Sequence, residues 1–183
     1  MAEAGDLQRV KNSPEGSRNL RNGAMTVPLP EDRLTKLIAE DELVNELRYE
    51  MERARRYGWD LGLFFVEPDV PADVGQDMAY PVLRRLAAVC STLMRSVDKG
   101  IRFQSGVLYI LPETPLGGVE TASDKVKKMF AEVDFEHPVT GEPFKCGMRR
   151  TIKVFAGKRE KDAATDEPAI RLILRELKDS LKA

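Results

Sequence analysis

With 183 residues, of which 42% are hydrophobic and 32% charged, the chain has an ordinary composition for a soluble globular protein. Its formal net charge of −1 gives no general attraction to nucleic acid or to an anionic membrane surface, and neither partner is expected. No apolar stretch approaches the roughly 18–20 residues that cross a bilayer, and the polar N-terminus lacks the apolar core of a secretory signal. These features predict a cytoplasmic protein.

Residues 1–30 are rich in Gly, Asn, Ser and Pro and contain few large apolar side chains. Such a segment cannot bury enough surface to offset the entropy lost on ordering, so a flexible tail is expected. A single folded domain is expected over residues 31–183, because a domain of this size can bury roughly two thirds of the surface of its unfolded chain.

A helix followed by a buried strand is expected to open the domain. Residues 39–57 carry apolar side chains at helical spacing, and Gly58 is typical of the position that ends a helix. The next segment, 61–66, is apolar on both faces and is followed by Pro68. A short apolar run of this kind is typical of a central strand that is covered on both sides.

A second helix and a β-hairpin come next. Pro81 suits the first turn of a helix over residues 82–94. Residues 101–103 and 107–111 then have the pattern of two short strands joined by a turn. A third amphipathic helix is expected over residues 117–133.

The last part of the domain is predicted to combine strand and helix. One or two strands are expected within residues 144–156, after a turn at Thr140 and Gly141, and a final helix is expected to begin near Asp166. This alternation predicts an α/β (α+β) domain in which helices pack on a central sheet. Protection of a sheet edge against aggregation is the simplest explanation for four cations in the strand region, Lys145, Arg149, Arg150 and Lys153.

The two cysteines of the chain, Cys90 and Cys146, lie far apart in sequence among apolar neighbours. Two buried free thiols are expected rather than a disulfide or half of a metal site.

Four separated stretches are similar to motifs of the GGDEF (diguanylate cyclase-like) family, in the same order and at nearly the same distances. They are the turn at 32–37, the helix end and strand at 52–66, the helix start at 82–87 and the segment 95–112. The resemblance covers about residues 30–183. It implies a nucleotidyl-cyclase-like fold with a central, mostly antiparallel sheet flanked by helices.

The residues that the family uses to make cyclic di-GMP from GTP are largely missing, which makes this a degenerate member by resemblance. Glu67 stands where a metal-binding Asp is implied, whereas Ala79 and Tyr80 replace a Gly-Asp pair that would contact guanine. The signature hairpin contains no carboxylate and reads Gln104-Ser105-Gly106-Val107-Leu108. Cyclase chemistry needs carboxylates that hold divalent metal against the phosphates. The chain is therefore expected not to be an enzyme and to hold no metal or other cofactor.

The resemblance also implies a ligand-binding site, because many family members bind cyclic di-GMP at an R-x-x-D motif five residues before the signature. Arg95 and Asp98 match this motif and spacing, and Lys125 falls where a third basic residue completes the site. A guanidinium can fork onto a phosphate and stack on guanine, and a carboxylate can accept hydrogen bonds from the guanine edge. The first hypothesis is therefore a catalytically inactive cyclic di-GMP receptor that passes a signal to a protein partner.

Two alternatives stand beside this hypothesis. Arg95 near a helix C-terminus and Asp98 in a turn are also explained by local structure alone. The whole domain could instead be a nucleotide-independent protein-interaction or scaffold domain. Its surface would then be the former active-site face, defined as residues 70–80 and 104–107. That face carries a mostly apolar set suited to protein contact, namely Val70, Val74, Met78, Tyr80 and Val107.

Overall fold

The computed structural model describes residues 28–160 and 162–181. The flexible tail predicted for residues 1–30 falls almost entirely on residues outside these ranges. None of the helices in the described ranges is both long enough and apolar enough to cross a membrane.

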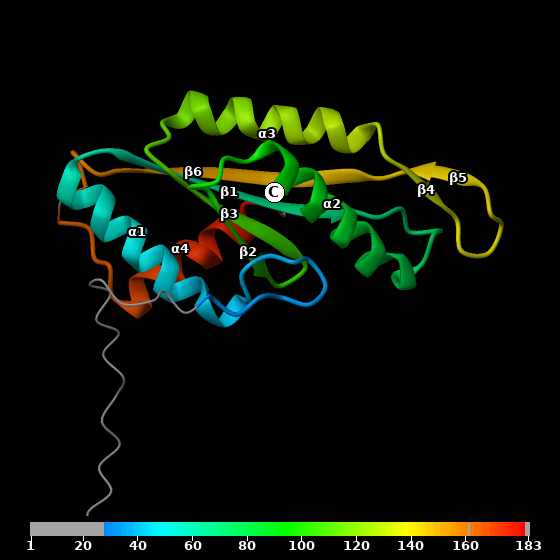
Figure 1. The fold of residues 1–183 in the computed structure, drawn as a ribbon, viewed down its shortest axis with the longest axis horizontal. Coiled ribbons are helices and arrows are strands. Elements are labelled where there is room, and N and C mark those ends of the chain that lie inside the picture. The colour runs from blue at the N-terminus through cyan, green and yellow to red at the C-terminus, as the bar shows by residue number, and fades with distance from the viewer. Residues whose placement is uncertain (1–27, 161, 182–183) are drawn as a thin grey trace, which may run out of the picture.

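A four-stranded antiparallel sheet forms the centre of the domain (Figure 1). Its strand order is β2-β3-β1-β6, so that β2 and β6 are the edges. The strands span Asp60–Asp69 (β1), Lys99–Phe103 (β2), Gly106–Pro112 (β3) and Gly147–Ala156 (β6). The predicted fold class, a mostly antiparallel sheet flanked by helices, is confirmed.

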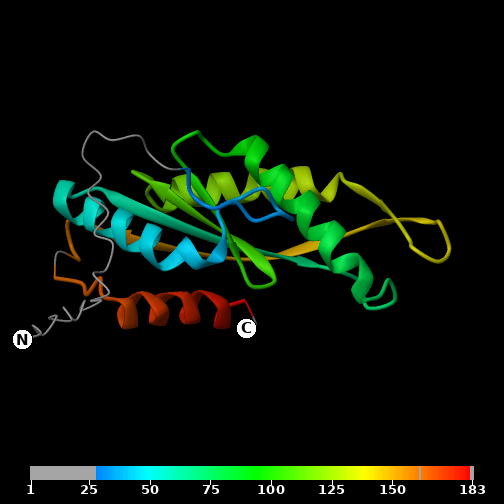
Figure 2. The same cartoon turned by 60° about the horizontal axis from the view of Figure 1, so that its bottom comes forward.

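Helices cover both faces of this sheet. The helices span Leu43–Tyr57 (α1), Ala79–Leu93 (α2), Leu116–Ala131 (α3) and Glu167–Asp179 (α4), with short 3₁₀ turns at Glu40–Glu42 (η1) and Gln76–Met78 (η2). One hydrophobic cluster joins α2 and α3 to one face, and a second cluster joins α1 and α4 to the other (Figures 1 and 2).

Strand β1 explains why two clusters form. Its alternate side chains point to opposite faces, so Phe64 and Val66 enter the cluster under α2 and α3. Leu63 and Phe65 enter the cluster under α1 and α4. The continuous apolar run of the sequence is therefore a strand buried on both faces, as predicted.

Two boundaries differ from the sequence-based expectation. Strand β1 continues through Pro68 to Asp69, because beyond Val66 it pairs only with β6 and thus lies at a sheet edge, where proline is tolerated. Helix α2 begins at Ala79 rather than at residue 82, which still leaves Pro81 in the first turn.

A small hairpin was not predicted. Strands β4 (Asp134–Glu136) and β5 (Pro143–Lys145) form a separate two-stranded sheet that extends beyond the central one (Figure 1). The predicted turn at Thr140 and Gly141 lies in this hairpin, where Gly141 has a φ of 71° that glycine adopts without strain. Helix α3 ends at Ala131, two residues earlier than expected.

Both cysteines are free and buried, as predicted. Burial raises the pKa of Cys90 to about 12 and that of Cys146 to about 11, from an ordinary value of 9.0.

These raised pKa values predict a loss of stability at high pH. The folded protein keeps both thiols protonated, so the stability they contribute is present below pH 9 and is lost as the pH rises from 9 towards 12. Urea unfolding at pH 8 and pH 10 should show a free energy of unfolding that is lower at pH 10 by about 2–3 kcal/mol. The double variant Cys90→Ala/Cys146→Ala should lose most of this pH dependence. An equal pH dependence in the two proteins would contradict the assignment.

Candidate ligand-binding site

Glu67 lies near the end of β1, and its side chain is buried. The Ser105 hydroxyl donates a hydrogen bond to Oε1 of Glu67, and Nη2 of Arg149 lies 3.3 Å from Oε2. Arg149 is the residue directly opposite Glu67 in the β1–β6 ladder. The carboxylate that could have held a metal ion is thus bound by side chains of the protein itself.

The turn between β2 and β3 is held by polar contacts from two other elements. Gln104 has a φ of 50°, and its backbone amide donates to Oε2 of Glu40 at 3.0 Å. Lys178 of α4 donates to Oε1 of the same glutamine.

Within residues 28–160 and 162–181, no three His, Cys, Asp or Glu side chains are grouped so that they could hold a metal ion.

Arg102 is a site residue that the sequence analysis missed. Its Nη1 donates to the carbonyl oxygen of Gly106 at 2.9 Å. Burial lowers the pKa of Arg102, although the nearby carboxylates of Asp32 and Glu40 oppose this effect. Arg149 pairs with Glu67, and Arg102 also interacts electrostatically with this carboxylate. No sequence motif predicts the contacts of Arg102 and Arg149, because these contacts depend on how the strands pair.

Arg95 and Asp98 lie together in the turn that follows α2. The Asp98 carboxylate accepts from the backbone amide of Arg95 at 2.7 Å and from its Nη2 at 2.9 Å. The side chain of Asp98 is only 3% exposed, whereas that of Arg95 is 54% exposed. The hydrogen bonds that the Arg95 guanidinium donates to Asp98 raise the pKa of Arg95.

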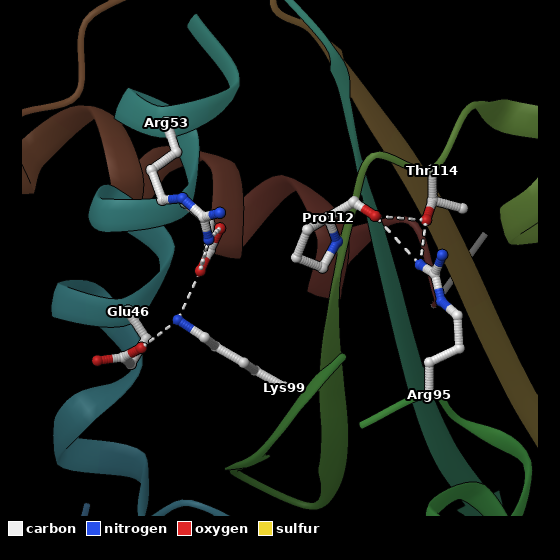
Figure 3. A network of polar contacts seen from close by, with 7 residues as sticks. Glu46, Arg53, Arg95, Lys99, Pro112 and Thr114 are labelled. Atoms are coloured by element: carbon white, nitrogen blue, oxygen red, sulfur yellow. Dashed lines mark hydrogen bonds and ion pairs between the residues drawn. The ribbon is translucent and has the colours of Figure 1, made fainter. Parts of the chain in front are cut away.

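The guanidinium of Arg95 also reaches the end of β3 (Figure 3). Its Nη2 donates to the carbonyl oxygen of Pro112 at 3.1 Å and to the hydroxyl of Thr114 at 2.7 Å. None of the hydrogen bonds among the described residues uses Nη1 of Arg95. One edge of a fixed, solvent-accessible guanidinium is therefore available to a ligand.

Lys125 lies apart from this pair. It is exposed on α3, nine residues after Leu116, at which the helix begins. At about 1.5 Å per residue this is about 13 Å along the helix axis. The described residues include no ion pair or hydrogen bond of Lys125, so the structure joins two of the three predicted site residues and leaves the third separate.

The apolar surface expected on the former active-site face is not present. Val74 and Val107 are buried, and Val70 and Met78 are half-buried against the core. Tyr80 alone of the five predicted side chains is exposed, at 64%. Residue spacing alone does not reveal that Val74 and Val107 are buried.

The cations predicted to protect a sheet edge have specific partners. Arg149 and Arg150 lie on the edge strand β6, where they pair with Glu67 and with Asp124 of α3. Lys153 on the same strand pairs with Glu176 of α4 at 2.6 Å. These contacts tie the edge strand to the helices and to β1.

A wide groove runs beside α2 on the face of the helix that points away from the sheet. The turn at residues 33–36 lines one part of the groove, and Asp134 and Phe135 line another. Tyr80, Arg84 and Arg85 contribute from α2. The groove has a volume of about 1250 Å³.

No protein-family model matches the sequence, and no curated protein matches it either. Solved structures do match. The diguanylate cyclase SiaD from Pseudomonas aeruginosa, solved in complex with its activator SiaC, is 22% identical with a TM-score of 0.61. The match covers 80% of this chain, which spans only 58% of the SiaD chain.

Two isolated GGDEF domains match over most of their length. The GGDEF domain of FimX from Pseudomonas aeruginosa is 13% identical with a TM-score of 0.66, and the match covers 82% of this chain and 92% of that one. The GGDEF domain of DgcB from Caulobacter crescentus, in complex with c-di-GMP, is 17% identical with a TM-score of 0.62. That match covers 85% of this chain and 94% of the DgcB chain. Agreement of this extent shows a common fold.

Proposed function

Since the chain has the fold of GGDEF domains, we propose that it is a catalytically inactive signalling domain that binds cyclic di-GMP through Arg95, Asp98 and Lys125. One observation carries the proposal: Asp98 holds the guanidinium of Arg95 in a fixed position while more than half of that side chain stays accessible. A fixed guanidinium loses little entropy when it binds a phosphate or stacks on a base.

The contacts of Glu67 support the absence of catalysis. A catalytic metal ion would have to displace Arg149 and Ser105 from this carboxylate and would find no second carboxylate in the turn at Gln104 and Ser105. Two-metal or single-metal phosphoryl transfer depends on such ligands. A GGDEF fold without them is suited to binding rather than to turnover.

The separation of Lys125 from Arg95 is compatible with the size of the ligand. A cyclic dinucleotide carries two phosphates, so one can meet Nη1 of Arg95 while the other meets the ammonium of Lys125 further along α3. Lysine contributes charge without a planar fork, so its share of the affinity is expected to be the smaller one.

Replacing Arg95 is expected to remove cyclic di-GMP binding. Isothermal titration of cyclic di-GMP into the whole chain should give micromolar binding, which Arg95→Ala weakens by at least about tenfold because the phosphate contact is lost. Lys125→Ala should weaken binding by about threefold, since a single exposed charge is removed. Arg56→Ala, at an exposed position on α1, should bind as the unchanged protein does.

Arg95 also connects its turn to the end of β3, so replacing it could destabilise the fold. The unfolding transition of each variant is therefore measured together with its affinity. A roughly threefold weaker affinity in a folded Lys125→Ala variant would support the site even if Arg95→Ala were unstable. No heat of binding in the unchanged protein would overturn the receptor proposal. Formation of cyclic di-GMP from GTP and magnesium would overturn the proposed inactivity.

A further inference from the structure

The groove beside α2 is a strongly charged concave surface that the proposed function does not use. It is lined by four cations, Arg33, Lys36, Arg84 and Arg85, and by a single carboxylate, Asp134. The chain as a whole has a net charge of −1, so the surface outside this groove is net acidic. The groove is therefore net positive, whereas the rest of the protein is net negative.

Three of these cations have no acidic partner. Within residues 28–160 and 162–181, Arg33, Arg84 and Arg85 make no ion pair and no side-chain hydrogen bond, and all three are exposed. Of the eleven other arginines in these ranges, five make ion pairs, namely Arg53, Arg95, Arg149, Arg150 and Arg171. Unpaired arginines that converge on one groove repel one another and favour an anionic occupant.

The groove also offers apolar contact. Tyr80 is 64% exposed at its edge, and Leu34, Pro81 and Phe135 contribute half-buried or exposed apolar surface. Arg84 lies one helical turn after Tyr80, so an aromatic ring and a guanidinium share one side of α2. Aromatic and arginine side chains are the types most enriched where protein partners bind tightly.

We propose that this groove binds an acidic segment of a partner protein, whose carboxylates meet Arg33, Arg84 and Arg85 while an apolar side chain packs on Tyr80. The inference is independent of cyclic di-GMP binding at Arg95. The groove lies on the outer face of α2 and shares only Tyr80 with the former active-site face.

Other occupants fit less well. A volume of about 1250 Å³ exceeds the roughly 300–1,000 Å³ of ordinary small-molecule pockets. A nucleic acid longer than the groove would meet the net acidic remainder of a chain with a pI of about 6.0, whereas nucleic-acid-binding domains are typically strongly basic. Residues 1–27 carry more cations than carboxylates, so their charge does not complement the groove.

The test uses the whole chain and a short fluorescein-labelled peptide of glutamates with a central leucine. Fluorescence anisotropy should show binding that the double variant Arg84→Ala/Arg85→Ala weakens by at least about tenfold. The matched control is Arg55→Ala/Arg56→Ala, which removes the same charge from α1, outside the groove. This control should change the affinity by less than about twofold, because distant surface charges are screened.

Two further probes separate the classes of occupant. The same peptide with glutamine in place of glutamate should not bind, and a single-stranded oligonucleotide of equal charge should bind at least about tenfold more weakly than the acidic peptide. Equal losses in the two double variants, or tighter binding of the oligonucleotide, would overturn the proposal. Absence of peptide binding to the unchanged protein would overturn it as well, whether or not cyclic di-GMP binds.

Discussion

Replacing Lys99 with methionine is expected to lower the free energy of unfolding by about 3–5 kcal/mol. The ammonium of Lys99, at the start of β2, lies 2.7 Å from Oε2 of Glu46 and 2.6 Å from Oε1 of Glu50 on α1 (Figure 3). Both carboxylates are only 1% exposed, and Lys99 is 22% exposed. Arg53 also pairs with Glu50, but the variant leaves two buried carboxylates with one cation fewer.

Urea unfolding followed by circular dichroism measures this loss. Lys127→Met, at an exposed position on α3, should change stability by less than about 0.5 kcal/mol. Adding Glu46→Gln to Lys99→Met should recover part of the loss, because a neutral amide needs no cation. A Lys99→Met protein as stable as the Lys127→Met protein would show that the network contributes little.

Replacing Gly106 with alanine is expected to cost about 3 kcal/mol and to disturb the contacts of Glu67. A Cβ at this position would lie 2.3 Å from the backbone oxygen of Val66 and 2.8 Å from Cγ of Glu67. Backbone at the end of β1 cannot move away without breaking the pairing of Val66 with Val107. The turn that carries Ser105 would therefore move away from Glu67 and weaken the hydrogen bond between these two side chains.

Gly117→Ala is the matched control for this prediction. Gly117 lies in the first turn of α3, and nothing lies within 4 Å of a Cβ placed there. Alanine in a helix should raise stability there by up to about 1 kcal/mol. The two glycine variants should thus move the urea midpoint in opposite directions, and a shift in the same direction would contradict the proposed close approach at Gly106.

Sequence periodicity was sufficient to predict the four long helices, the buried strand β1 and the hairpin of β2 and β3. It was not sufficient for β4, because three residues are too few to display an alternating pattern. It also could not extend β1 through Pro68, because that extension depends on where β3 stops pairing with β1. Strand ends are determined by neighbouring strands rather than by the local sequence.

At the site too, contacts between residues close in sequence can be predicted from a motif, whereas contacts between residues far apart in sequence cannot. Arg95 and Asp98 are three positions apart, so a sequence motif can predict their contact. The contact of Arg149 with Glu67 spans 82 residues, and nothing in either segment alone indicates it. The basic groove likewise combines side chains from the turn at residues 33–36, α2 and β4, so its charge became evident only from the arrangement of these elements.

The strand order has a consequence for the kinetics of folding. The hairpin of β2 and β3 closes a turn of two residues, whereas the pairing of β1 with β6 closes a loop of 77 residues between Asp69 and Gly147. Because the entropy of loop closure increases with loop length, we expect β6 and α4 to dock in the final step. The pairing of Glu67 with Arg149 would then form only in the completed molecule, and amide hydrogen exchange should be fastest on β6 among the strands of the central sheet.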